Sequence, residues 1–183
     1  VGDRLRTTND RIFAAGDCAS RFQFTHMADA LARIVIRNAL FFGRARASRL
    51  IVPWVTYTDP EVAATGLSLD AAREASHDDA RTTRVELTSV DRARLDGETE
   101  GFLEVVHTRK GRLLGGTLVA AHAGESISEL TLAVTQGLTI GDLADVIHPY
   151  PTVAEAFRKA GDVFNRTRLT PRTEALLKWL ARR

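Results

Sequence analysis

The sequence predicts an α+β fold, in which an antiparallel sheet with helices follows the last strand and helix of an α/β domain. Three observations predict this arrangement. Short β-rich runs occupy residues 54–57, 81–90, 101–108 and 113–121. Helical stretches come after these runs rather than between them, as in α+β domains. A strand, a tight turn and a helix come before residue 49 and indicate one edge of a nucleotide-binding fold.

The first part of the chain begins with an apolar run at residues 12–15 that ends in Gly16-Asp17. This pattern predicts a buried parallel strand that stops at a tight turn. Apolar residues then recur with helical spacing over residues 28–42, and Gly43 is a plausible helix stop. We therefore assign residues 1–48 to the end of an α/β domain.

The remainder of the chain is divided by turn signals at Asp59-Pro60, Asp96-Gly97 and Lys110-Gly111. Residues 100–106 alternate in character, as in an antiparallel strand with two different faces. Helices are predicted at residues 125–137, 140–146, 153–165 and 172–180. We assign residues 49–168 to one α+β domain and residues 169–183 to a basic amphipathic tail helix.

Composition limits the function classes. The 183 residues are 44% hydrophobic and carry a net charge of +2, which fits a globular protein with a core. Residues 155–183 hold eight Lys/Arg against three Asp/Glu. This segment could contact nucleic acid or an anionic membrane, but a solvated helix face is the preferred interpretation. No nucleic-acid-reading motif accompanies it, so we expect neither a nucleic-acid nor a membrane partner.

Cys18 is the single cysteine, which excludes an intramolecular disulfide and a cysteine-based metal cluster and fits the reducing cytoplasm. His77, His107 and His122 lack metal-ligand spacing, so no metal site is predicted. No charged and apolar leader opens the chain, and no apolar run is long enough to span a membrane. Because the chain begins at Val1 as if within a domain, we expect it to be part of a longer polypeptide.

Asp17 is the first candidate site residue, because ligands of open α/β sheets bind at the carboxyl ends of the strands. Its carboxylate can accept hydrogen bonds from ligand hydroxyls, and Gly16 lets the backbone approach closely. The alternative is that Asp17 only caps a helix or forms a turn.

The segment from His148 to Glu155 is the second candidate. Pro149 and Pro151 stiffen it, and the Tyr150-Pro151 bond is a candidate cis peptide. Thr152 and Glu155 have the spacing of a capping box that opens a helix from Val153 onward. A phenol with an ordinary pKa of ~10 is a weak base but a good hydrogen-bond donor.

Three stretches at compatible spacings resemble one family. They are residues 8–17, residues 52–66 and residues 148–155. Together the chain is similar to the C-terminal part of class I pyridine nucleotide-disulfide oxidoreductases, and particularly to mercuric reductase and dihydrolipoamide dehydrogenase. The resemblance implies an FAD-dependent NAD(P)H oxidoreductase that forms a homodimer through residues 49–168. This chain alone is expected to be inactive, because the redox cysteines and the dinucleotide fold of such enzymes are absent from it.

The resemblance also implies roles for the residues near the front of the chain. Gly16 and Asp17 match the residues that bind the ribityl and pyrophosphate part of FAD. The next helix of such enzymes points its amino end at the flavin, and here that end falls at Thr25, His26, Met27 and Ala28. The positive end of the helix favours negative charge on the reduced flavin. His26 is equally well explained as a structural residue.

Tyr150 stands where disulfide-reducing relatives carry a proton-transferring His that the matching Glu155 orients. That His-Glu relay cannot operate with a phenol, so we expect a small-molecule or metal-ion electron acceptor that needs little proton transfer. His148 could supply a proton by another route or simply cap or pack. Mercuric enzymes end in neighbouring cysteines that this sequence lacks, which argues against mercury as the substrate.

Two other functions remain open. The domain could be a non-catalytic homodimerisation module. It could also belong to a membrane-surface redox protein with the basic tail as the tether. In that tail Leu176, Leu177 and Leu180 form an apolar stripe with Trp179 beside it, for which docking on the protein's own body is the preferred interpretation.

Overall fold

The computed structural model describes residues 1–170, 173 and 178–180. The chain divides into two compact units, Val1–Val52 and Pro53–Arg183, and each is described by itself. The division into residues 1–48, 49–168 and 169–183 that the sequence indicates stays a prediction. No helix within the described residues has the length and apolar character needed to cross a membrane.

The first unit is built on one amphipathic helix, α1 (Thr25–Leu40). Its apolar face buries Met27, Leu31 and Ile34 against Leu5 from the preceding loop. Ala45 lies beyond the end of the helix, and its backbone makes two hydrogen bonds of 2.9 Å with the side chain of Asn38 in the last turn of α1. The residues that follow the helix are thereby tied back to it. A short 3-10 helix, Ala47–Arg49, follows.

The prediction of a buried parallel strand at residues 12–15 is wrong. Phe13 makes a single antiparallel bridge with Arg6, and Ile12 is 52% exposed. Within residues 1–52 only this short antiparallel partner pairs with residues 12–15.

The second unit contains a five-stranded sheet in the order β1-β2-β5-β4-β3, with every pair antiparallel. The strands are β1 (Trp54–Thr56), β2 (Glu61–Gly66), β3 (Arg81–Glu86), β4 (Phe102–His107) and β5 (Leu113–Ala120). The predicted α+β fold with an antiparallel sheet is confirmed. Strand β2 was not predicted, although the turn at Asp59-Pro60 that precedes it was.

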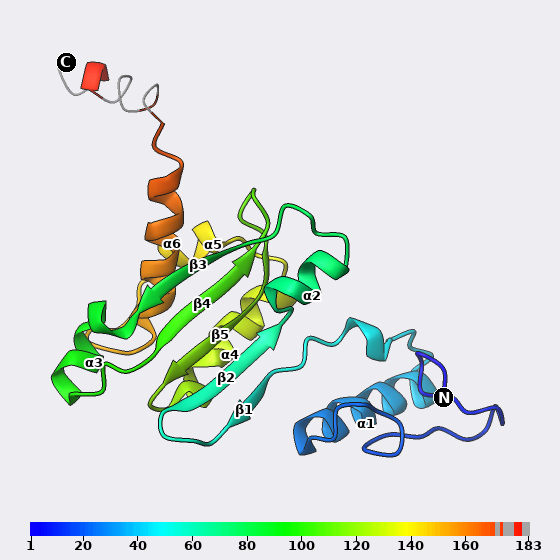
Figure 1. Ribbon diagram of the computed structural model, residues 1–183. Helices are drawn as coiled ribbons and strands as arrows, with labels where there is room; N and C mark the ends of the chain where they lie inside the picture. Colours follow the sequence, from blue (N-terminus) through cyan, green and yellow to red (C-terminus); the bar gives the residue numbers. More distant parts are fainter. Residues whose placement is uncertain (171–172, 174–177, 181–183) are drawn as a thin grey trace. The chain divides into compact units, whose positions relative to one another are not determined.

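One face of the sheet is covered by helices α4 (Ala123–Thr135) and α6 (Glu155–Thr167) (Figure 1). The main core lies between these helices and the sheet, and it includes Leu103, Leu118, Leu130 and Phe157. Because successive strand residues point to opposite faces, Val105 joins this core while Val106 packs on the other face with Ala72 of α2 (Leu69–Glu74). The short helices α3 (Asp91–Asp96) and α5 (Ile140–Asp145) complete the unit.

The predicted helix at residues 172–180 falls largely outside the described residues. Of this stretch, only Thr173 and residues 178–180 are described, and they are helical. Of the apolar stripe Leu176, Leu177 and Leu180, the described residues therefore include only Leu180.

Helices α5 and α6 pack so closely at Gly161 that no side chain fits there. A Cβ added at Gly161 would lie 2.7 Å from the Ala144 nitrogen and 2.7 Å from the Ile140 oxygen. We expect Gly161→Ala to lower the free energy of unfolding by about 1–2 kcal/mol, since overpacking outweighs the gain in helix propensity. Urea denaturation measures this change.

Gly141→Ala on α5 is the matched control, because the added Cβ would meet no atom closer than 3.5 Å. This variant should be neutral or stabilising. Equal destabilisation by both substitutions would contradict the packing argument.

Candidate functional site

The loop between α5 and α6 is anchored from inside by His148. Its Nδ1 lies 3.0 Å from the Val146 carbonyl oxygen, and its Nε2 lies 2.8 Å from Oε1 of Glu129 on α4. Each ring nitrogen thus faces an oxygen acceptor, and the side chain is only 4% exposed. His148 therefore holds the loop, and in this structure its ring does not face solvent.

The residues beside His148 point outward instead. Ile147 is 95% exposed and Tyr150 is 70% exposed. Pro149 and Pro151 restrict the backbone around Tyr150, and the Tyr150-Pro151 peptide bond is cis, as predicted. The loop therefore has a restricted backbone and exposes two side chains, Ile147 and Tyr150, to solvent.

The Tyr150 hydroxyl donates a hydrogen bond of 2.9 Å to Oδ2 of Asp91 at the start of α3. This bond and the negative charge of Asp91 raise the pKa of Tyr150 above its ordinary value, and Glu155 adds a smaller contribution. The phenol therefore remains a protonated hydrogen-bond donor at neutral pH. Nothing in the local sequence pointed to Asp91, which lies 59 residues away in a helix that was not predicted.

The predicted capping box at Thr152 and Glu155 is wrong. Helix α6 begins at Glu155, its N-cap is Ala154, and no side chain caps it. The Thr152 hydroxyl donates instead to the Pro149 carbonyl at 2.8 Å. Consecutive turns at residues 152–157 lead into the helix, so Glu155 is its first residue and not its third.

Glu155 is instead held by cations on its own helix. Its Oε1 accepts a hydrogen bond of 2.7 Å from Arg158 and lies 3.6 Å from Lys159 Nζ. The side chain is 8% exposed, and Oε2 is buried without a hydrogen-bond partner among the described residues. A buried carboxylate oxygen left unpaired is costly.

In the first unit, the turn at Gly16 lies against the start of α1. Gly16 has φ +85°, a conformation that favours glycine, and its added Cβ would lie 3.7 Å from Ala28 Cβ. Asp17 follows this turn and is exposed. The structure therefore brings the predicted residues Gly16 and Ala28 together, and Asp17 is the next residue after Gly16.

The amino end of α1 begins at Thr25, and its N-cap residue Phe24 provides no side-chain cap. Met27 is buried in the core, so only its backbone can face a ligand. His26 stacks on Phe24 with ring centroids 5.1 Å apart. This helix end can present backbone N–H groups and a positive dipole to an anionic ligand.

No group of three or more side chains suited to hold a metal ion occurs in the described part of the chain. The chemistry that these residues offer is hydrogen bonding and electrostatic stabilisation.

The raised pKa of Tyr150 yields a titration test. In the folded state the phenol's interaction with Asp91 is complete below the ordinary pKa of ~10 and is lost as the pH rises through the raised value. We expect Asp91→Asn to lower the pKa of Tyr150, because the carboxylate charge is removed. Ultraviolet titration in a Tyr57→Phe background, which leaves Tyr150 as the only tyrosine, measures it.

Asp96→Asn at the other end of α3 serves as the control, since Asp96 pairs with Arg92. It should leave the titration of Tyr150 unchanged. An unchanged midpoint in Asp91→Asn would refute the assigned hydrogen bond.

Comparisons with known proteins identify relatives of this chain. It is 39% identical over 167 residues to mercuric reductase of Staphylococcus aureus. The alignment covers 91% of this chain but 30% of that protein. The chain is 36% identical to mercuric reductase of Streptomyces lividans, which it matches over 90% of this chain and 35% of the relative. The chain thus spans about a third of the length of these curated relatives.

Solved structures agree with the sequence relatives. LpdA from Mycobacterium tuberculosis matches 93% of this chain and 36% of its own length, with a TM-score of 0.82 and 29% identity. The HOCl-induced flavoprotein disulfide reductase RclA from Escherichia coli matches 90% of this chain and 38% of its own, with a TM-score of 0.78 and 28% identity. The family model of the pyridine nucleotide-disulphide oxidoreductase dimerisation domain matches residues 52–161. The chain belongs to the pyridine nucleotide-disulphide oxidoreductase family.

Proposed function

We propose that the chain supplies the end of the FAD-binding domain and the dimerisation domain of an FAD-dependent NAD(P)H oxidoreductase that works as a homodimer. Residues 1–48 belong to the FAD-binding domain, residues 49–168 form the dimerisation domain, and residues 169–183 form a basic tail. The observation that carries this proposal is the anchored loop with Ile147 and Tyr150 on its outside. A loop of this kind is suited to reach a second subunit.

Enzymes of this family depend on FAD and NAD(P)H. The local structure fits a flavin, since Asp17 is exposed and the preceding Gly16 lies against Ala28 in the first turn of α1, whose amino end has no side-chain cap. Asp17 would accept hydrogen bonds from the ribityl or ribose hydroxyls, and Gly16 would let the backbone approach them. The backbone at Thr25, His26, Met27 and Ala28 would stabilise negative charge on the ring. FAD held by these residues would supply hydride and electron transfer between NAD(P)H and the acceptor.

The homodimer would use the same patch on both subunits, as a twofold interface requires. Leaving Ile147 exposed to water is unfavourable, and burying it against a partner would stabilise the dimer. In this arrangement Tyr150 completes the partner's active site.

The raised pKa of Tyr150 suits a role as hydrogen-bond donor rather than as base. Its hydroxyl would polarise a bound acceptor and leave the proton in place. We propose that this acceptor is a small molecule or a metal ion. Several relatives are named mercuric reductases, and RclA has been solved as a Cu(II) complex. His148 and Glu155 would act as positioning residues for the loop and for the start of α6.

We propose a cytoplasmic location, because the single cysteine of these 183 residues fits a reducing compartment.

Flavin retention tests the proposed function. In the product of the complete gene, we expect Asp17→Asn to weaken FAD binding by about 10-fold or more, because a charge-assisted hydrogen bond is lost. The flavin content after purification, read from absorbance near ~450 nm, and its bleaching by NADH or NADPH measure this.

Asp10→Asn is the matched control, since Asp10 is an exposed carboxylate whose ion pair with Arg6 spans 3.8 Å at the surface. It should retain wild-type flavin. A wild-type protein that carried no flavin, or an Asp17→Asn variant that kept all of it, would refute the proposal.

A further inference from the structure

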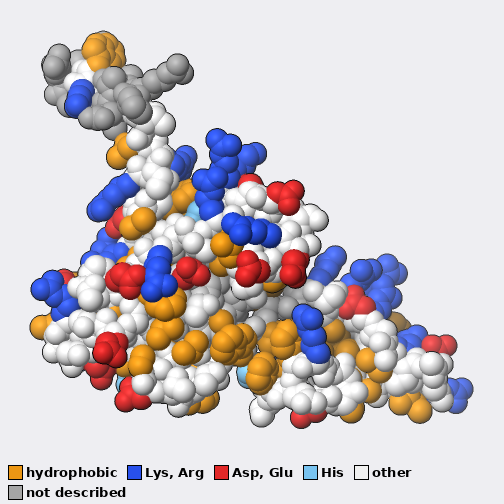
Figure 2. Space-filling view, viewed as in Figure 1, with side chains coloured by type: hydrophobic (Ala, Val, Ile, Leu, Met, Phe, Trp, Pro, Cys, Tyr) orange, Lys and Arg blue, Asp and Glu red, His pale blue; other side chains and the backbone are white. Residues whose placement is uncertain are grey.

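A cavity of about 680 Å³ lies in the second unit, between the start of β3, the β4–β5 turn and the end of α6. Four cationic side chains line it: Arg81, Arg109, Lys110 and Arg168. No Asp or Glu is among the lining residues. Asp79 accepts the backbone N–H of Arg109 at 3.0 Å but does not line the cavity. Figure 2 shows Lys and Arg side chains gathered over this end of the sheet.

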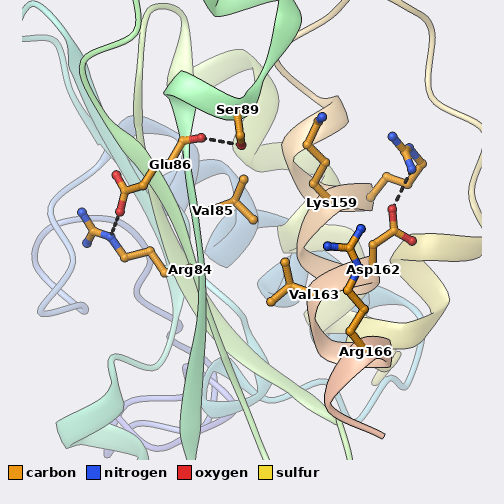
Figure 3. A pocket seen from close by; sticks show the side chains of 9 residues that line it. Arg84, Val85, Glu86, Ser89, Lys159, Asp162, Val163 and Arg166 are labelled. Carbon is orange, nitrogen blue, oxygen red and sulfur yellow. Dashed lines mark hydrogen bonds and ion pairs between the residues drawn. The ribbon is translucent and has the colours of Figure 1, made fainter. Parts of the chain in front are cut away.

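These four cations have no ion-pair partner among the residues that the structure describes. A neighbouring cavity of about 500 Å³, between β3 and α6, is different (Figure 3). There two acidic residues are part of the lining, since Arg84 pairs with Glu86 and Arg158 pairs with Asp162, although Arg166 has no ion pair among the described residues. A cleft lined by unpaired charges of one sign concentrates counter-ions, so the larger cavity, which has no acidic lining residue, is better suited to an anion.

The floor of the larger cavity is neutral and polar. His107 Nδ1 donates to the Thr108 carbonyl at 2.8 Å, so its Nε2 accepts from the Thr83 hydroxyl at 2.8 Å. Burial lowers the pKa of His107, the bond to Thr108 opposes this, and the charge of Arg81 lowers it further. The ring packs edge-on against Phe164, with centroids 5.1 Å apart. The positive charge therefore sits at the rim, on three separate segments.

A single phosphate would fill only a small part of this cavity and could not contact cations on all three segments at once. The arrangement therefore favours a ligand with more than one anionic group. Guanidinium groups match phosphate oxygens well. We propose that this cavity binds a small molecule that carries two or more phosphate groups. None of the residues that line the cavity is among those assigned to the flavin or to the loop at Tyr150.

Calorimetric titration of the 183-residue chain with inorganic tripolyphosphate tests this inference. We expect saturable binding of one anion per chain. The double variant Arg81→Gln/Arg109→Gln should bind tripolyphosphate at least 10-fold more weakly. Both side chains are exposed, so circular dichroism should show an unchanged fold. Arg94→Gln removes an exposed charge on α3 outside the cavity and should alter affinity less than twofold. The NMR signals of the His107 ring should shift on binding.

Several outcomes would overturn the proposal. The absence of saturable binding, or equal weakening by Arg94→Gln, would show that no site is built here. Orthophosphate that bound as tightly as tripolyphosphate would remove the requirement for several phosphates. Polyglutamate that bound while tripolyphosphate did not would identify an acidic protein segment as the occupant instead.

Discussion

The contact between His148 and Glu129 is the interaction on which the proposed site depends. It ties the loop between α5 and α6 to α4, which packs on the sheet. Because the histidine ring is held inside, its neighbours Ile147 and Tyr150 are presented outward on a rigid support. Without this anchor the two prolines would stiffen the loop but would not fix its direction. The position of the phenol therefore follows from a contact between segments distant in sequence.

Much of the fold could be predicted because its signals are local. The runs at β3, β4 and β5 have alternating or β-branched residues, and α4, α5 and α6 were predicted within two residues at each end. Strand β2 was missed, since Ala63-Ala64-Thr65-Gly66 has little β propensity and is stabilised by pairing with β5. The apolar run at residues 12–15 forms only a single bridge, between Phe13 and Arg6, within the described residues.

The candidate site was predicted less completely. Tyr150 and its stiff loop were identified from Pro149 and Pro151, and the turn at Gly16 from its glycine and the strand-like run before it. The partners Asp91 and Glu129 were not, because each acts across a tertiary contact that no spacing rule encodes. Glu155 was assigned to a capping box by spacing alone, yet the turns before α6 shift the helix start and give it cationic partners instead.

The central claim is that the outward face of this loop pairs two copies of the chain. Sedimentation equilibrium of the wild type and of Ile147→Asp tests it most directly, with Ala75→Asp at the exposed end of α2 as the control for an added charge. The account predicts a dimer for the wild type and the control, and at least a 10-fold higher dissociation constant for Ile147→Asp. A monomeric wild type, or an Ile147→Asp variant that dimerised as well as the wild type, would contradict it.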